Sequence, residues 1–129
     1  MGTREVGEAF VAAINSGRAE RVYAMMAPEH VFIDSLGAEV SGREAMLDGW
    51  RGYFRLFPDY RIEVDGWYID EQSALLHGSA SATLYRHAVP VPDGKWRIPA
   101  AWRMVSDGRK VALWQVYADN KPVYALLEH

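Results

Sequence analysis

The spacing of apolar side chains changes once along this chain, near residue 60. From residue 3 to residue 57 they recur every three or four positions, as in Val6, Phe10 and Ile14. From residue 60 to residue 118 they alternate with polar ones, as in Tyr60 and Ile62. The first period is that of a helix buried on one side, and the second is that of a strand. Helices followed by an antiparallel run of strands predict one α+β domain.

Capping residues, glycines and prolines set the bounds of the predicted helices and strands. We expect helices over about 3–15, 19–26 and 43–57, and a short strand over 31–33 between the second and third helices. Ser41 and Glu44 have the spacing of a capping box at the start of the third helix. Strands are expected from 60 to 70, 73 to 87, 95 to 105 and 111 to 118, with a bulge at Gly66 and a turn at 92–95. Asp119 is expected to cap a short C-terminal helix.

Composition excludes several function classes. The chain has 129 residues and a net charge of −3, with acidic and basic residues interspersed, so neither nucleic acid nor an anionic membrane is an expected partner. It has no cysteine, which excludes disulfides and thiolate metal sites, and no histidine has metal-ligand spacing. No apolar run approaches about 20 residues and no signal-peptide pattern is present, so a soluble, cytoplasmic protein is expected. Residues 127–129 resemble a remnant of an expression tag, which leaves 1–126 as the domain.

The stretch EHVFIDSLG, residues 29–37, places a carboxylate directly after an apolar strand. Two interpretations of Asp34 stay open on the sequence alone. Its side chain caps the following Ser-Leu-Gly turn in solvent, or it lines a cavity in which its charge is used.

Four segments in order resemble the SnoaL-like and ketosteroid-isomerase-like branch of the NTF2-like superfamily. They are FVAAINSGRAERVYAMMAPEHVFIDSLG, SGREAM, LFPDYRIEV and SDGRKVALWQVYADNKPVYALL, which together span nearly the whole chain. The resemblance implies a cone in which a curved antiparallel sheet and three N-terminal helices enclose an apolar pocket. It also implies a homodimer packed through the sheet, and chemistry that needs no cofactor or metal.

The resemblance also implies site residues. Asp34 matches the general base of the isomerases, while the positions of their two oxyanion donors match Phe10 and Ala101, which cannot donate. Because losing one such donor typically costs about 10²–10³ in rate, this argues against the same reaction by the same machinery. Trp50, Tyr53, Phe54 and Trp114 are expected to shape the pocket as well.

One strand carries two further expectations. If Ala101 faces the pocket, Arg103 shares that facing, and a guanidinium near Asp34 would suit a ligand that bears a carboxylate. Trp96 and Trp102 then face outward, where a sheet-to-sheet homodimer would bury them.

The function expected from these observations is a SnoaL-like, polyketide-cyclase-like enzyme acting on an apolar carbonyl-type small molecule. Asp34 would assist proton transfer in an isomerisation, a cyclisation or a dehydration. The alternative is a non-catalytic protein that binds a small ligand on the same fold. A third class, a structural dimerisation module, predicts an interior filled by Phe10, Trp50 and Trp114.

Overall fold

The computed structural model describes residues 2–128, which form six strands and four helices in the expected α+β order. The helices are α1 (Thr3–Asn15), α2 (Ala19–Ala24), α3 (Arg43–Leu56) and α4 (Lys121–Leu127). The strands are β1 (Met26–Ile33), β2 (Glu39–Ser41), β3 (Arg61–Asp70), β4 (Ser73–Arg86), β5 (Val89–Ser106) and β6 (Val111–Ala118). Position 129, in the predicted tag remnant, lies outside the described residues, whereas Leu127 continues α4. None of the described helices is long and apolar enough to cross a membrane.

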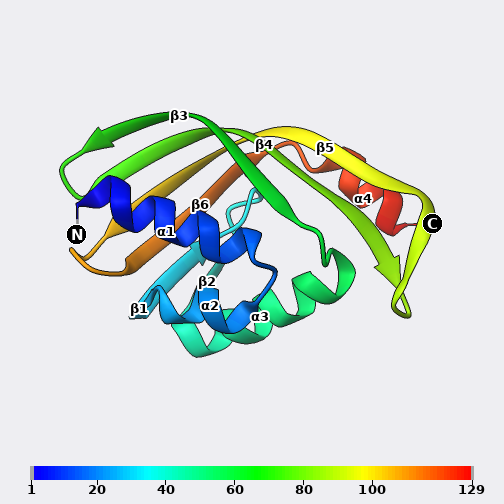
Figure 1. The fold of residues 1–129 in the computed structure, drawn as a ribbon, viewed down its shortest axis with the longest axis horizontal. Helices are drawn as coiled ribbons and strands as arrows, with labels where there is room; N and C mark the ends of the chain where they lie inside the picture. Colours follow the sequence, from blue (N-terminus) through cyan, green and yellow to red (C-terminus); the bar gives the residue numbers. More distant parts are fainter. Residues whose placement is uncertain (1, 129) are drawn as a thin grey trace.

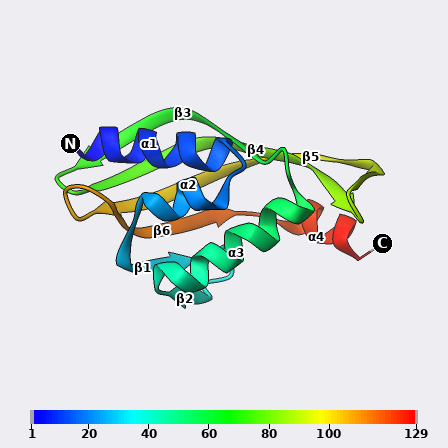
Figure 2. The same cartoon turned by 60° about the horizontal axis from the view of Figure 1, so that its bottom comes forward.

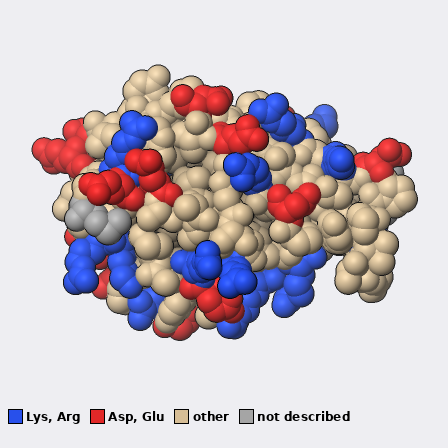
Figure 3. Space-filling view, in the orientation of Figure 1, with Lys and Arg blue, Asp and Glu red and all other residues tan. Residues whose placement is uncertain are grey.

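The strands form one curved sheet with the order β2-β1-β6-β5-β4-β3. All neighbours pair antiparallel except β1 and β6, which run parallel. The sheet arches over α1, α2 and α3, while α4 lies beside β5 at the end of the molecule away from the N-terminus (Figures 1 and 2). Acidic and basic side chains are interspersed over the face seen in Figure 3. The α+β cone with three N-terminal helices on one side of the sheet is confirmed.

The facing predicted for β5 is wrong. Trp96, Ile98, Ala100, Trp102 and Met104 are buried on the concave side, beneath the helices. Ala101 and Arg103 lie on the opposite, convex side, where the Nε of Arg103 donates to Oε1 of Gln115 at 3.3 Å. The physical reason is that the bulky apolar set gains most from burial under the helices.

This reversal removes two expectations. Trp96 and Trp102 are not exposed for a dimer partner, because their exposed fractions are 8% and 0% within the single chain. Arg103 lies on the other side of the sheet from the concave core, so it is not available to hold Asp34 ionised.

The starts of α3 and β1 differ from the predicted ones. Gly42, with φ at 94°, is the N-cap of α3; Ser41 ends β2, and Glu44 accepts a hydrogen bond from the hydroxyl of Tyr23 at 2.8 Å, so the capping box is wrong. Strand β1 begins at Met26 and includes Pro28, because its register against β6 is irregular between Met26 and Val31. Such irregular positions are where a strand tolerates proline.

The β4–β5 hairpin turns earlier than predicted. His87 and Ala88, with φ of 53° and 62°, form the turn, as a two-residue loop between twisted strands requires. Residues 92–95 lie inside β5, opposite a register shift between Thr83 and Tyr85.

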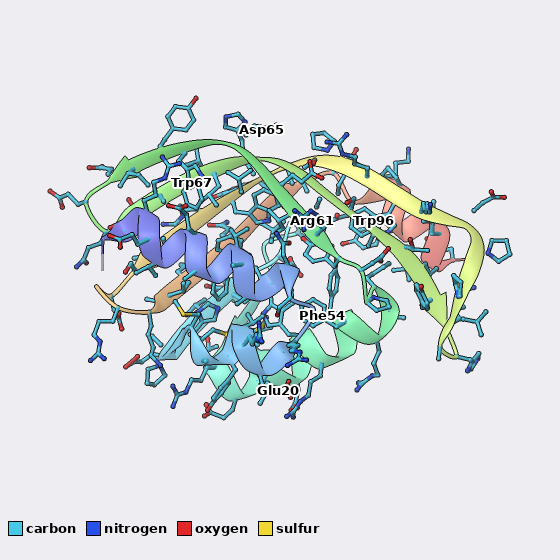
Figure 4. All side chains as sticks on the ribbon, viewed as in Figure 1. Glu20, Phe54, Arg61, Asp65, Trp67 and Trp96 are labelled. Carbon is cyan, nitrogen blue, oxygen red and sulfur yellow. The ribbon has the colours of Figure 1, made fainter. Side chains whose placement is uncertain are left out.

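The bulge at Gly66 is confirmed by the register shift between Val64 and Gly66 in the β3–β4 pair. It turns Trp67 toward the helices, as Figure 4 shows. A Cβ built on Gly7 of α1 would meet the Trp67 ring at 2.6 Å, so glycine is what allows helix and strand to approach here. Since bulges bend and twist strands, this one contributes to the curvature over the core.

Candidate functional site

A cavity of about 380 Å³ lies between the concave side of the sheet and helices α3 and α4. This volume is within the range of small-molecule sites. Leu56 at the end of α3 and Tyr124 and Leu127 on α4 also line it, and each is 38–41% exposed, so the cavity reaches the surface. The structural-module alternative predicted a filled interior, and the cavity contradicts it.

Five aromatic side chains form one side of the cavity, which we call the aromatic belt: Trp50, Tyr53, Phe57, Tyr60 and Trp96. Each ring contacts at least one other in the belt, with centroid separations from 4.9 to 6.5 Å. Helical spacing brings Trp50, Tyr53 and Phe57 together from α3 and its C-cap. Inward alternation brings Trp96 from β5, and Figure 4 labels this residue. Each ring of the belt therefore packs against a neighbouring ring.

Trp102 and Trp114 line a second part of the cavity and stack at 6.2 Å between ring centroids. Phe10 lies behind Trp114, at 4.9 Å, and does not line the cavity. Phe54 does not line it either; it packs on Trp50 at 5.3 Å. Of the predicted pocket residues, the structure therefore brings together Trp50, Tyr53 and Trp114 with Asp34. Phe10 and Phe54 are core, and Ala101 and Arg103 face away.

Asp34 combines the two interpretations that the sequence left open. It follows β1 and lines the cavity, and its Oδ1 also accepts hydrogen bonds from the backbone N–H groups of Leu36 at 2.9 Å and Ala38 at 3.0 Å. Its second oxygen, Oδ2, has no hydrogen-bond partner among residues 2–128. Oδ1 thus fixes the carboxylate on its turn, and Oδ2 takes no part in that turn.

Ser35 and Asn120 extend this polar part of the cavity lining. The amide Nδ2 of Asn120 donates to Oγ of Ser35 at 2.7 Å, which joins the loop after β1 to the start of α4. Asp119 accepts a hydrogen bond from the backbone N–H of Lys121 at 3.0 Å, but the N-cap of α4 is Asn120, one residue later than predicted. At its other end α4 is held by Arg86, whose Nη2 donates to the carbonyls of Leu126 and Leu127 at 3.3 and 3.1 Å. Side-chain contacts at both ends therefore hold α4 as a wall of the cavity.

The tyrosines of the belt are un-ionised donors. Burial raises the pKa of Tyr53 far above its usual range, with neighbouring tyrosines adding to the effect. Burial likewise raises the pKa of Tyr60. Neither hydroxyl is therefore ionised near neutral pH.

Three indole N–H groups in the cavity walls have no acceptor among the described residues: those of Trp50, Trp96 and Trp102. These three nitrogens have essentially no accessible surface, so the donors lie unpaired within the packed walls and do not face the open cavity. Sequence reasoning identified Trp50 as such a donor but missed Trp96, Trp102, Tyr60 and Asn120. The inward alternation of β5 would have identified the two tryptophans.

His30 lies in β1 and is fully buried behind the cavity. Its Nδ1 lies 2.7 Å from the carbonyl oxygen of Val111, so Nδ1 carries the proton, and Nε2 has no partner among residues 2–128. Phe10 packs against its ring with the centroids 6.0 Å apart. Burial lowers the pKa of His30 below its usual value, although the bond to Val111 opposes the shift.

This burial predicts an acid-sensitive fold. Above about pH 6.5 the histidine is neutral in both states and contributes no pH dependence. Below it, the unfolded chain takes up the proton and the folded chain does not, so the free energy of unfolding falls by up to about 1.4 kcal/mol per pH unit. Urea unfolding from pH 7.5 to 5 measures this slope.

Two variants separate His30 from the other titrating groups. His30→Asn keeps a donor near the Nδ1 position and should flatten the slope between pH 6.5 and 5. His77→Asn, at an exposed position on β4, should keep the wild-type slope. Equal slopes for wild type and His30→Asn would contradict the assignment.

Solved structures with the same architecture cover nearly the whole chain. One is a protein with a ketosteroid isomerase-like fold from Catenulispora acidiphila, in complex with trimethylamine (TM-score 0.79, 16% identity, 95% of this chain and 91% of that one). Another is a putative SnoaL-like polyketide cyclase from Shewanella denitrificans (TM-score 0.82, 8% identity, 98% and 96%). A third is an LEH-like epoxide hydrolase from M. tuberculosis (TM-score 0.76, 14% identity, 98% and 86%). At these identities the likeness shows the fold.

A search of curated proteins found no match. The model of the SnoaL-like domain family, by contrast, matches residues 8–120, which include Asp34 and all five residues of the aromatic belt. This match shows that the chain belongs to the SnoaL-like domain family.

Proposed function

We propose that this chain is a small-molecule enzyme that transfers a proton on an apolar carbonyl-type compound, in an isomerisation, a cyclisation or a dehydration. Asp34 would take the proton beside the carbonyl and return it elsewhere on the same molecule. The observation that carries the proposal is the position of Asp34, which among residues 2–128 is the one formally charged side chain lining a mostly apolar cavity. No cofactor is required for such a reaction.

The enolate formed in this reaction needs hydrogen-bond donors. Phe10 is in the core and Ala101 is on the convex face, so the two isomerase donor positions supply none. The hydroxyls of Tyr53 and Tyr60, which both line the cavity, are candidate replacements. Donors fixed in a low-dielectric wall stabilise a developing oxyanion without reorganising.

Hydrogen–deuterium exchange tests the proposal without knowledge of the natural substrate. Cyclic ketones incubated with the protein in D2O should exchange the protons beside the carbonyl for deuterium. NMR measures this exchange directly as loss of the proton signals. We expect Asp34→Asn to slow the catalysed exchange by about 100-fold or more, because a positioned base contributes about 10²–10⁴ in rate. The asparagine Oδ1 still accepts from Leu36 and Ala38, so the turn is retained.

Asp48→Asn is the matched control, since the Asp48 side chain on α3 is 82% exposed and lies outside the cavity lining. It should exchange ketones at the wild-type rate. Exchange by Asp34→Asn at that same rate would exclude the base role of Asp34.

The alternative is a protein that binds a small ligand without turnover. The double hydrogen bond at Oδ1 favours it, because this gives Asp34 a structural reason to be present. Under this alternative, ketones bind in the cavity, as measured by quenching of tryptophan fluorescence, and wild type does not accelerate their exchange.

A homodimer through the sheet stays a proposal, now on different residues. Tyr68, Leu75 and Tyr117 are 64%, 44% and 45% exposed, and they lie on the convex face. We expect a dimeric mass in light scattering at micromolar concentration, and a monomeric mass would exclude this dimer.

A further inference from the structure

The formal charge of the cavity lining distinguishes between classes of ligand. Asp34 contributes one negative charge, and no lysine, arginine or histidine of residues 2–128 lines the cavity. An anionic ligand would therefore enter an apolar space with no counter-charge and with a carboxylate already present, which is unfavourable. The charge distribution favours cations first and neutral molecules second.

The polar groups of the lining point to the same class. Besides Oδ2 of Asp34, the Oδ1 of Asn120 has no hydrogen-bond partner among residues 2–128, because Asn120 uses its Nδ2 to donate to Ser35. The lining therefore offers two acceptor oxygens, one on Asp34 and one on Asn120, and the Asn120 amide already donates to Ser35. A protonated amine carries donors only, so it complements this part of the cavity.

The aromatic belt supplies the third observation. Trp50, Tyr53, Tyr60 and Trp96 all line the cavity, and the ring face of an aromatic side chain attracts a cation electrostatically, tryptophan most strongly. The attraction is larger where water is excluded, and the exposed fractions of Trp50, Tyr60 and Trp96 are only 6–8%. A quaternary ammonium group, which cannot donate hydrogen bonds, would gain from the belt and from the charge of Asp34 alone.

We propose that the cavity selects apolar ligands that carry a protonated or quaternary amine over neutral and anionic ligands of the same shape. The inference names the ligand class of the proposed function and rests on that function only for the identity of the cavity. Asp34 acts here as a counter-charge, which does not require proton transfer.

A pair of isosteres tests the selection. Phenyltrimethylammonium and tert-butylbenzene have the same shape and differ by one positive charge, and benzoate supplies the anion. Titrations followed by tryptophan fluorescence, with NMR as a second readout, give the three dissociation constants. We expect the cation to bind about tenfold more tightly than tert-butylbenzene, and benzoate to bind more weakly than both.

Asp34→Asn should weaken binding of phenyltrimethylammonium several-fold and leave that of tert-butylbenzene unchanged. Unchanged binding of the neutral probe also shows that the variant is folded. Asp48→Asn should alter neither dissociation constant. Binding of tert-butylbenzene as tight as that of the cation, or no binding of the cation, would overturn the inference.

The two proposals fail separately. If the cation is not preferred but ketone exchange depends on Asp34, the ligand class is excluded and the proposed function is retained. Preference for the cation without any ketone exchange would support the ligand class and exclude proton transfer on the ketones.

Discussion

Gly78→Ala is expected to lower the free energy of unfolding by about 3 kcal/mol, the upper part of the usual range for overpacking. Gly78 lies on β4 opposite Val64, next to the bulge in β3. A Cβ at this position would overlap the carbonyl oxygen of Glu63 and lie 3.0 Å from the Cα of Val64. Both atoms belong to the backbone, so no rotamer change relieves the contact, and the two strands must separate.

The control substitution is Gly52→Ala in α3. Its nearest neighbour would be Nη2 of Arg55 at 3.8 Å, which is ordinary contact, and alanine is the better helix former. It should stabilise the fold by up to about 1 kcal/mol. Urea unfolding of both variants measures the difference, and a Gly78→Ala variant as stable as wild type would show that the strands are less tightly apposed than described.

Phe10→Ala should cost about 4 kcal/mol of stability, as is typical when a fully buried phenylalanine is truncated. Phe10 is 0% exposed and packs between His30 and Trp114, with centroid separations of 6.0 and 4.9 Å. Removal of the Phe10 ring leaves a void behind the cavity wall. The Trp114 ring fills this void only in part, because it stacks on Trp102 on its other side.

Two further substitutions separate core from ligand contact. Phe10→Leu should keep most of the stability and bind tert-butylbenzene as wild type does, because Phe10 does not line the cavity. Phe32→Ala, at a half-buried position that does line it, should cost less stability than Phe10→Ala but weaken binding of the same probe. Weakened binding by Phe10→Leu would instead place Phe10 in the ligand site.

The fold class could be predicted from sequence because the change of hydrophobic period is a property of long segments. The residues of β6 reproduce the predicted bounds, and the bulge at Gly66 was predicted from a single glycine within an alternating run. Strand β2, in contrast, is three residues long, and the exposed Glu39 and Ser41 leave it no apolar pattern to recognise.

The cavity was predictable only in part, and β5 shows why. Alternation alone would have placed Trp96, Trp102 and Met104 inward, because their apolar side chains exceed those of the other set. The match of Ala101 to an isomerase residue led instead to the prediction that Ala101 faces inward. A displacement of one residue in such a match exchanges the two faces of a strand, so the whole facing was reversed. Asn120 was missed for another reason, since its bond to Ser35 joins residues 85 positions apart.

The wall formed by α4 separates two tasks within the domain. The sheet and the first three helices hold the core together, whereas the seven-residue segment Lys121–Leu127 closes one side of the chamber through Asn120 and Arg86. Substituting Val123, Tyr124 or Leu127 would therefore change the shape of the cavity, while the sheet keeps its strand pairing. Substitutions in this segment alone would therefore change the size of ligand that the cavity accommodates.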